Sequence, residues 1–210
     1  MTSSVFIVAA ERSGDDLGAS LIRMLRAQEP NIALQGIGGA AMRGEGVESG
    51  IDIAPLSILG FTEAIKAYPV VLERVRQSVD YIISCNPSAV VLIDSWGFMI
   101  RIAQRLKKAG FKGKIIKYVA PQVFAMREGR AKILAASVDH LMTIHSFDAH
   151  YFERHGLPVT YVGNPMFDTD YKAGDGAAFR RRLNIAGHDP VVAVLLGSRR
   201  NEIDRLSEPF

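Results

Sequence analysis

The sequence lacks the features that mark a disulfide-bonded protein, a protein that binds a metal through cysteine pairs, or a membrane-spanning protein. Cys85 is its only cysteine, so the chain forms no internal disulfide and offers no cysteine pair for a metal or for redox chemistry. No apolar run approaches the roughly 20 residues that a membrane-spanning helix needs. We see no export signal at the start of the chain. These absences favour a cytoplasmic protein whose contact with a membrane is peripheral.

The chain also lacks a large excess of positive or negative side chains. The chain carries 25 Lys and Arg against 22 Asp and Glu, a formal net charge of +3. Its basic residues gather in three short segments, at 101–117, 127–132 and 180–182, where they suit contacts with phosphate. The sequence has no basic stripe interleaved with aromatics, no zinc-ligand spacing and no known nucleic-acid-binding module. It therefore argues against nucleic acid as a partner.

Apolar, β-branched segments alternate with helical patterns along most of the chain. Strands are predicted at 4–10, 33–36, 89–94, 114–119, 139–144 and 159–162. Helices are predicted at 61–86, near 126–136 and at 147–155. This alternation predicts an α/β fold with a doubly wound, parallel, Rossmann-like sheet. Ligands bind such sheets beyond the carboxyl ends of the strands, so the loops there are expected to hold the site.

The sequence predicts a domain boundary near residue 172. Residues 1–172 are expected to form the Rossmann-like domain, and the Gly-rich, polar segment at 172–176 a linker that leads to a helix at 177–183. A fresh apolar strand is predicted at 191–196, followed by a loop and the first turn of a helix. Residues 173–210 are therefore expected to be a linker and the first strand-loop-helix unit of a truncated second domain.

The loop at 11–16 follows the first predicted strand and begins the first helix. Free backbone N–H groups at such a helix start attract an anion or a polar sugar. Ser13 and Asp15 are also good helix caps, and capping alone would explain either of them. A carboxylate at Glu11, directly at the strand end, is instead expected to point into the crevice. The loop is neither a P-loop nor a G-x-G-x-x-G fingerprint, which argues against a nucleotide bound there in that geometry.

Asp94 ends the most apolar predicted strand. Two roles fit a carboxylate at this position: a general base that takes the proton from an acceptor hydroxyl, or a cap for the helix that starts near Gly97. We favour the general base, because ligand crevices of doubly wound sheets lie at this edge.

Three later segments are further candidates for substrate contacts. Arg127 and Arg130 follow the fourth of these strand-loop units and suit a bound phosphate, or else lie on a solvated helix face. Loops at 163–165 and 197–199 are expected to line an interdomain cleft, where Arg199 either neutralises a leaving diphosphate or is a surface residue of a simple turn. The apolar segment at 56–61 is core, or it admits acyl chains or rests on a membrane surface.

Several short motifs, in this order, together resemble the lipid-A-disaccharide synthase family of GT-B glycosyltransferases. They are Ala10-Glu11-Arg12-Ser13-Gly14-Asp15, Gly38-Gly39-Ala40-Ala41-Met42, Leu59-Gly60-Phe61-Thr62-Glu63, Ile93-Asp94, Val119-Ala120-Pro121-Gln122-Val123-Phe124-Ala125, Val138-Asp139-His140-Leu141, Gly163-Asn164-Pro165 and Gly197-Ser198-Arg199 with Glu202-Ile203. The resemblance covers essentially all of the chain and a little over half of a full-length member. Trp96-Gly97-Phe98 departs from it, because the family commonly has Pro-Asp-Phe there.

The resemblance implies that the chain is the amino-terminal, acceptor-side half of a GT-B fold in an inverting hexosyltransferase. The donor would be UDP-2,3-diacylglucosamine and the acceptor 2,3-diacylglucosamine 1-phosphate, whose 6-hydroxyl attacks to give the lipid A disaccharide and UDP. No metal or other cofactor is implied. The enzyme would act in the cytoplasm, peripherally on the inner membrane, with a homodimer left open, and this fragment alone would be inactive.

The residues expected to carry that reaction come from the motifs. Asp94 and Glu11 are the expected catalytic residues. The expected substrate-binding residues are Ser13, Gly14, Asp15, Arg127, Asn164, Ser198, Arg199 and Glu202. The alternatives are another GT-B-like glycolipid transferase or a sugar-nucleotide epimerase and, as a third class, a non-catalytic lipid-binding scaffold. Lipid binding separates the disaccharide synthase from the epimerase, and loss of function in point mutants separates an enzyme from a scaffold.

Overall fold

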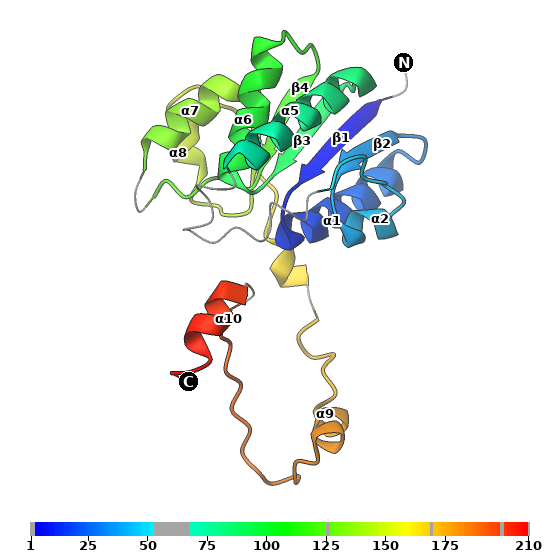
Figure 1. Cartoon of the computed structure of the whole chain (residues 1–210), viewed down its shortest axis with the longest axis vertical. Helices are drawn as coiled ribbons and strands as arrows, with labels where there is room; N and C mark the ends of the chain where they lie inside the picture. The colour runs from blue at the N-terminus through cyan, green and yellow to red at the C-terminus, as the bar shows by residue number, and fades with distance from the viewer. Residues whose placement is uncertain (1–2, 53–67, 125–126, 169, 198–199, 210) are drawn as a thin grey trace. The chain divides into compact units, whose positions relative to one another are not determined.

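The structure is a computed structural model that describes residues 3–52, 68–124, 127–168, 170–197 and 200–209 (Figure 1). The chain divides into two compact units, Met1–Asn164 and Pro165–Phe210. The domain boundary near residue 172 stays a prediction. Within the described residues, no helix is long and apolar enough to cross a membrane.

The first unit is built on a six-stranded sheet in which every neighbouring pair of strands is parallel. In chain order its strands are β1 (Ser4–Ala9), β2 (Ala33–Ile37), β3 (Ala89–Ile93), β4 (Lys114–Tyr118), β5 (His140–Thr143) and β6 (Val159–Tyr161). They lie side by side in the order β2-β1-β3-β4-β5-β6. The chain moves from β1 to β2 and then returns to the other side of β1 as β3, so the switch in strand order falls between β1 and β3.

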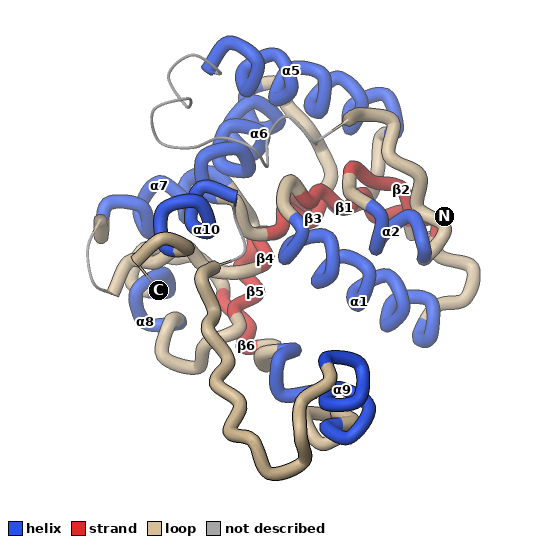
Figure 2. The backbone as a smooth tube through the Cα atoms, turned by 60° about the horizontal axis from the view of Figure 1, so that its bottom comes forward, coloured by secondary structure: helices blue, strands red, loops and turns tan. Residues whose placement is uncertain are grey.

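Helices cover both faces of this sheet (Figure 2). The helices α1 (Arg12–Gln28) and α2 (Ala40–Gly44) lie on one face, and α5 (Tyr68–Cys85), α6 (Trp96–Lys108), α7 (Gly129–Ser137) and α8 (Ala149–Glu153) lie on the other. Successive side chains of a strand point to opposite faces, so Ile7 of β1 packs in the cluster with Ile22 of α1, while Phe6 packs in the cluster with Ile82 of α5. Burial on both faces explains why the central strands β1 and β3 are apolar at nearly every position. The predicted doubly wound α/β fold is confirmed.

Several predicted helices have different bounds in the structure. The helix predicted at 61–86 is described only from Tyr68 onward, as α5, and residues 61–67 lie outside the described part. The helix expected near 126–136 begins at Gly129, as α7. The one expected at 147–155 is the short helix α8, Ala149–Glu153.

The second unit holds a 3-10 helix, η1 (Pro165–Asp168), and the helices α9 (Gly176–Leu183) and α10 (Arg200–Leu206). Asp175 caps α9, because its carboxylate accepts the backbone N–H of Ala178 at 2.8 Å. The strand predicted at 191–196 is wrong: residues 190–197 form no strand, and Leu195 is 90% exposed. A strand requires a neighbour that pairs with its backbone, and no described strand pairs with this segment.

Candidate active site

The two predicted catalytic carboxylates follow adjacent strands, at the switch point of the sheet. Ala9 of β1 pairs with Ile93 of β3 in the parallel register. Glu11 comes two residues after the end of β1, and Asp94 directly after the end of β3. The structure therefore brings Glu11 and Asp94 to the same edge of the sheet. The crevice outside the carboxyl ends at a switch point is where doubly wound sheets bind ligands.

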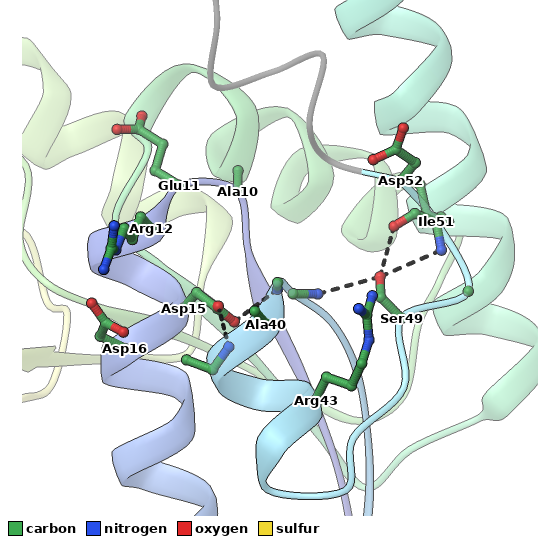
Figure 3. A pocket seen from close by; sticks show the side chains of 14 residues that line it. Ala10, Glu11, Arg12, Asp15, Asp16, Ala40, Arg43, Ser49, Ile51 and Asp52 are labelled. Carbon is green, nitrogen blue, oxygen red and sulfur yellow. Dashed lines mark hydrogen bonds between the residues drawn. The ribbon is translucent and has the colours of Figure 1, made fainter. Parts of the chain in front are cut away.

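An open cavity of about 1020 Å³ lies beyond β1 and β2 (Figure 3). Its lining comes from the start of α1, from the loop between β2 and α2, and from the segment at 49–52. Charged side chains of both signs line it: Glu11, Arg12, Asp16, Arg43 and Asp52. A cavity of this volume with charged side chains and backbone polar groups in its lining suits a sugar-sized, hydroxyl-rich ligand.

Asp15 lines the same cavity, but its carboxylate is hydrogen-bonded to backbone N–H groups. It is only 5% exposed and accepts hydrogen bonds from the N–H groups of Gly39 at 2.7 Å, Ala41 at 2.8 Å and Met42 at 3.2 Å (Figure 3). These are N–H groups at the start of α2, which have no partner within that helix. Asp15 therefore caps α2 across the loop, and not the first helix as the capping alternative had it. Its role in substrate binding stays a prediction.

The start of α1 also differs from the expectation. Glu11 occupies the N-cap position of α1, and no side-chain hydrogen bond caps that helix there. Ser13 lies in the first turn of α1 with an exposed side chain, and Gly14 is buried against Ala9 and Ile93. Of the residues predicted in this loop, Glu11 and Asp15 line the cavity. The roles of Ser13 and Gly14 in substrate binding stay predictions.

Two further contacts shape the cavity floor. A Cβ atom at Gly39 would lie 2.7 Å from Oδ2 of Asp15, so only glycine allows the carboxylate to approach this backbone closely. Oγ of Ser49 donates to the carbonyl of Ile51 at 2.7 Å and accepts the N–H of Gly38 at 3.3 Å. The Gly38-Gly39 pair therefore has a structural role in the floor of the cavity.

The backbone at Asp94 is strained. Asp94 has φ +50° and Ser95 has φ +34°, in the left-handed region that favours glycine. Such conformations cost on the order of 1–3 kcal/mol each and persist where the surroundings hold them, often at functional sites. Ser95 occupies the N-cap position of α6. The alternative role for Asp94, as the cap of that helix, is therefore not observed.

Lys117, which lies on β4 next to Asp94 at this edge of the sheet, was not identified from the sequence. It is 2% exposed, and its Nζ donates to the carbonyl oxygens of Asp94 at 2.7 Å and Tyr118 at 3.0 Å. Burial lowers the pKa of Lys117 from 10.5 to about 7, an effect that the negative charge of Asp94 partly offsets. A lysine in an apolar central strand was the signal available, because such a charge is buried only when it has partners.

Arg130 lies near the same turn and packs on the only tryptophan of the chain. Its guanidinium carbon lies 5.2 Å from the ring centroid of Trp96. Partial burial lowers the pKa of Arg130, and the positive charge of Arg127 lowers it further. Arg127 is exposed, with φ +67°. Two neighbouring guanidinium groups suit the oxygens of a phosphate, so Arg130 joins Arg127 as a candidate ligand-binding residue.

The other predicted site residues lie elsewhere. Asn164 follows β6 and ends the first unit. Ser198 and Arg199 lie outside the described residues, as does the apolar segment at 56–61, and α10 contains Glu202, whose side chain is not described. Among the side chains that the structure does describe, no group of three or more His, Cys, Asp or Glu residues could hold a metal ion.

Comparisons with known proteins agree with the motifs. Residues 5–210 match the family model of lipid-A-disaccharide synthetase. The chain is 41% identical over 207 residues to the lipid-A-disaccharide synthase of Rhodospirillum centenum, a match that covers 98% of this chain and 52% of that protein. It is 40% identical to the Paramagnetospirillum magneticum protein of the same name, with 98% and 53% covered. The chain thus spans about half the length of the curated relatives it matches.

Solved structures resemble this chain in fold alone. A Staphylococcus aureus MnaA-UDP co-structure superposes with a TM-score of 0.59 at 11% identity, covering 86% of this chain and 50% of that one. A UDP-N-acetylglucosamine 2-epimerase from Rickettsia bellii superposes with a TM-score of 0.57 at 14% identity, covering 89% and 52%. The family itself rests on the sequence match over nearly the whole chain. This chain belongs to the lipid-A-disaccharide synthetase family.

Proposed function

We propose that this chain provides the acceptor-binding part of a hexosyltransferase that forms the lipid A disaccharide. The observation that carries the proposal is the placement of Glu11 and Asp94 at the switch point of the sheet, where Glu11 also lines the cavity, in a chain of this family. The relatives are about twice as long as the matched region, so the activity is proposed for the complete gene product.

The proposed reaction is a single displacement with inversion. The 6-hydroxyl oxygen of 2,3-diacylglucosamine 1-phosphate bonds to C1 of the diacylglucosamine on UDP, while the bond between C1 and the diphosphate oxygen breaks. UDP leaves with that electron pair. The proton of the attacking hydroxyl passes to the carboxylate of Asp94, the general base. Inversion follows because the attacking and leaving oxygens lie on opposite faces of C1.

The remaining residues bind the two substrates in this proposal. Glu11 and the polar lining of the cavity hold the hydroxyl groups of the acceptor sugar. Arg127 binds phosphate, because a guanidinium presents paired donors to its oxygens. Ser198, Arg199 and Glu202 bind the donor, with Arg199 stabilising the charge that develops on the diphosphate. Attachment to the cytoplasmic face of the inner membrane, acyl-chain binding by the segment at 56–61, and a homodimer belong to the same proposal and rest on the family resemblance.

The test uses the complete gene product with both diacylated substrates. Mass spectrometry should detect the disaccharide 1-phosphate and an equal amount of UDP, and omission of the acceptor should abolish both. The same protein incubated with UDP-N-acetylglucosamine should leave its C2 configuration unchanged. Epimerised sugar nucleotide without any disaccharide would overturn the proposal in favour of an epimerase.

A further inference from the structure

We propose that Lys117 is a positioning residue for the glycosyl transfer: its amino group holds the carbonyl oxygens of Asp94 and Tyr118 and so fixes the turn that carries the Asp94 carboxylate. This inference rests on the proposed function, in which Asp94 takes the proton of the acceptor. Lys117 itself touches neither substrate in this account. It acts through the backbone of Asp94.

The hydrogen bonds around Asp94 form a closed connection between β3 and β4. Ile93 pairs with Tyr118 in the register, so Asp94 comes just beyond the last paired position. The N–H of Asp94 donates to the carbonyl of Tyr118 at 2.9 Å. Nζ of Lys117 then joins that same carbonyl, at 3.0 Å, to the carbonyl of Asp94, at 2.7 Å. Both backbone polar groups of Asp94 are therefore tied to β4.

The turn needs such an anchor because its backbone is unfavourable. Asp94, Ser95 and Val119 all have positive φ values, of +50°, +34° and +71°, although none of them is glycine. The turn leads directly into α6, whose first hydrogen bonds run from the N–H groups of Phe98 and Met99 to the carbonyl of Ser95. A side chain that fixes Asp94 thereby also fixes the start of α6.

The chemistry of an amine matches this task in both protonation states. Lys117 is buried, and of the charged groups that the structure describes, Asp94 is the one whose charge acts on it. The ammonium has three N–H donors and the neutral amine has two, one for each carbonyl. The hydrogen bonds therefore survive loss of the proton. An apolar side chain of similar length would leave the Asp94 carbonyl without this donor.

The first arm of the test measures the turn without any substrate. Hydrogen–deuterium exchange of the backbone at 94–99 is compared in the complete gene product and its variants Lys117→Met, Lys117→Gln and Lys114→Met. Lys114 lies on the same strand but is exposed, so it is the matched control. We expect at least tenfold faster exchange in Lys117→Met, parental exchange in Lys114→Met, and partial recovery in Lys117→Gln, whose amide keeps two N–H donors. Lys117→Gln carries the comparison if Lys117→Met does not fold, again with exchange faster than in the parent.

The second arm measures kinetics per folded protein. Lys117→Met is expected to lower kcat at least tenfold and to leave KM for both substrates within twofold, with kcat partly restored in Lys117→Gln. A merely structural lysine would change the folded fraction and not kcat. Parental exchange, or parental kcat, in the folded Lys117 variants would overturn the positioning role while Asp94→Asn is inactive. Full activity of Asp94→Asn would instead overturn Asp94 as the general base, and with it the catalytic role of the hydrogen bonds from Lys117.

Discussion

The carboxylate of Asp15, on α1, accepts the backbone N–H of Gly39, before α2, at a distance of 2.7 Å. The contact joins the first turn of α1, which follows β1, to the loop that follows the neighbouring strand β2. Both segments line the cavity, so one buried carboxylate sets the position of much of its floor. The polar motifs after these two strands therefore form one structural unit.

Substitution of Asp15 by Ala is expected to destabilise the first unit. It removes the acceptor of three backbone N–H groups in a largely buried place. The free energy of unfolding should fall by at least about 2 kcal/mol, since buried donors left without a partner are costly. Urea unfolding measures this change. Asp16→Ala, an exposed neighbour, is the control and should stay within about 0.5 kcal/mol of the parent. Equal stability of both variants would contradict the capping role.

The buried lysine predicts a specific pH dependence of stability. The folded-state pKa of Lys117 is depressed to about 7 from 10.5, so between these values the unfolded chain holds more protons on this group than the folded chain does. Its contribution to the free energy of unfolding is therefore greatest above pH 10.5 and is lost as the pH falls to about 7, at no more than about 1.4 kcal/mol per pH unit.

The parent and Lys117→Met should differ accordingly. The difference between their unfolding free energies, from urea titrations at pH 6 to 10, should shift in favour of the parent as the pH rises through this window. Lys114→Met, which removes an exposed lysine of the same strand, should show no such trend. A difference that stays constant with pH would mean that Lys117 keeps its ordinary pKa in the folded protein.

Trp96 offers a spectroscopic test of the arginine pair. It is the only tryptophan, and Arg130 lies over its ring. Pyrophosphate binding to Arg127 and Arg130 should change the emission of Trp96. Arg130→Ala should weaken that binding roughly tenfold, because a charge-assisted hydrogen bond is lost. Lys132→Ala, an exposed cation of α7, should bind as the parent does. Equal binding by all three proteins would remove Arg130 from the site.

Gly97 allows a gain-of-function experiment. Among the residues that the structure describes, a Cβ atom there would meet only Nη1 of Arg101, at 3.6 Å. Gly97 lies at the start of α6, where an acidic side chain is favourable. Members of the lipid-A-disaccharide synthase family commonly have Asp at this position. Gly97→Asp should therefore fold normally and restore part of the disaccharide formation that Asp94→Asn loses. Gly97→Ala is the control and should restore none. Equal rescue by Ala and Asp would contradict a role for the carboxylate.

Local patterns were enough to predict the sheet and its working edge. The apolar segments became β1 to β6 because both faces of the sheet are covered, and the loops after β1 and β3 hold Glu11 and Asp94 as expected. A parallel sheet places all carboxyl ends at one edge, so this much follows from strand positions alone.

Contacts between distant residues were beyond prediction. The carboxylate of Asp15 finds its donors more than twenty residues away, and Lys117 meets Asp94 across 23 residues. Which side chain reaches which backbone group depends on strand order and register, which periodicity does not reveal. The failed strand at 191–196 has the same cause, because its apolar pattern carried no information about a pairing partner.

The central claim is that Asp94 takes the proton of the acceptor hydroxyl, and one measurement addresses it directly. Disaccharide formation is followed by mass spectrometry with the complete gene product and its Asp94→Asn variant, at equal folded concentration. We expect product from the parent and at least a hundredfold lower kcat from Asp94→Asn, in the range that general base catalysis contributes. Parental turnover in Asp94→Asn would contradict the claim and move the base elsewhere, with Glu11 the next residue to substitute.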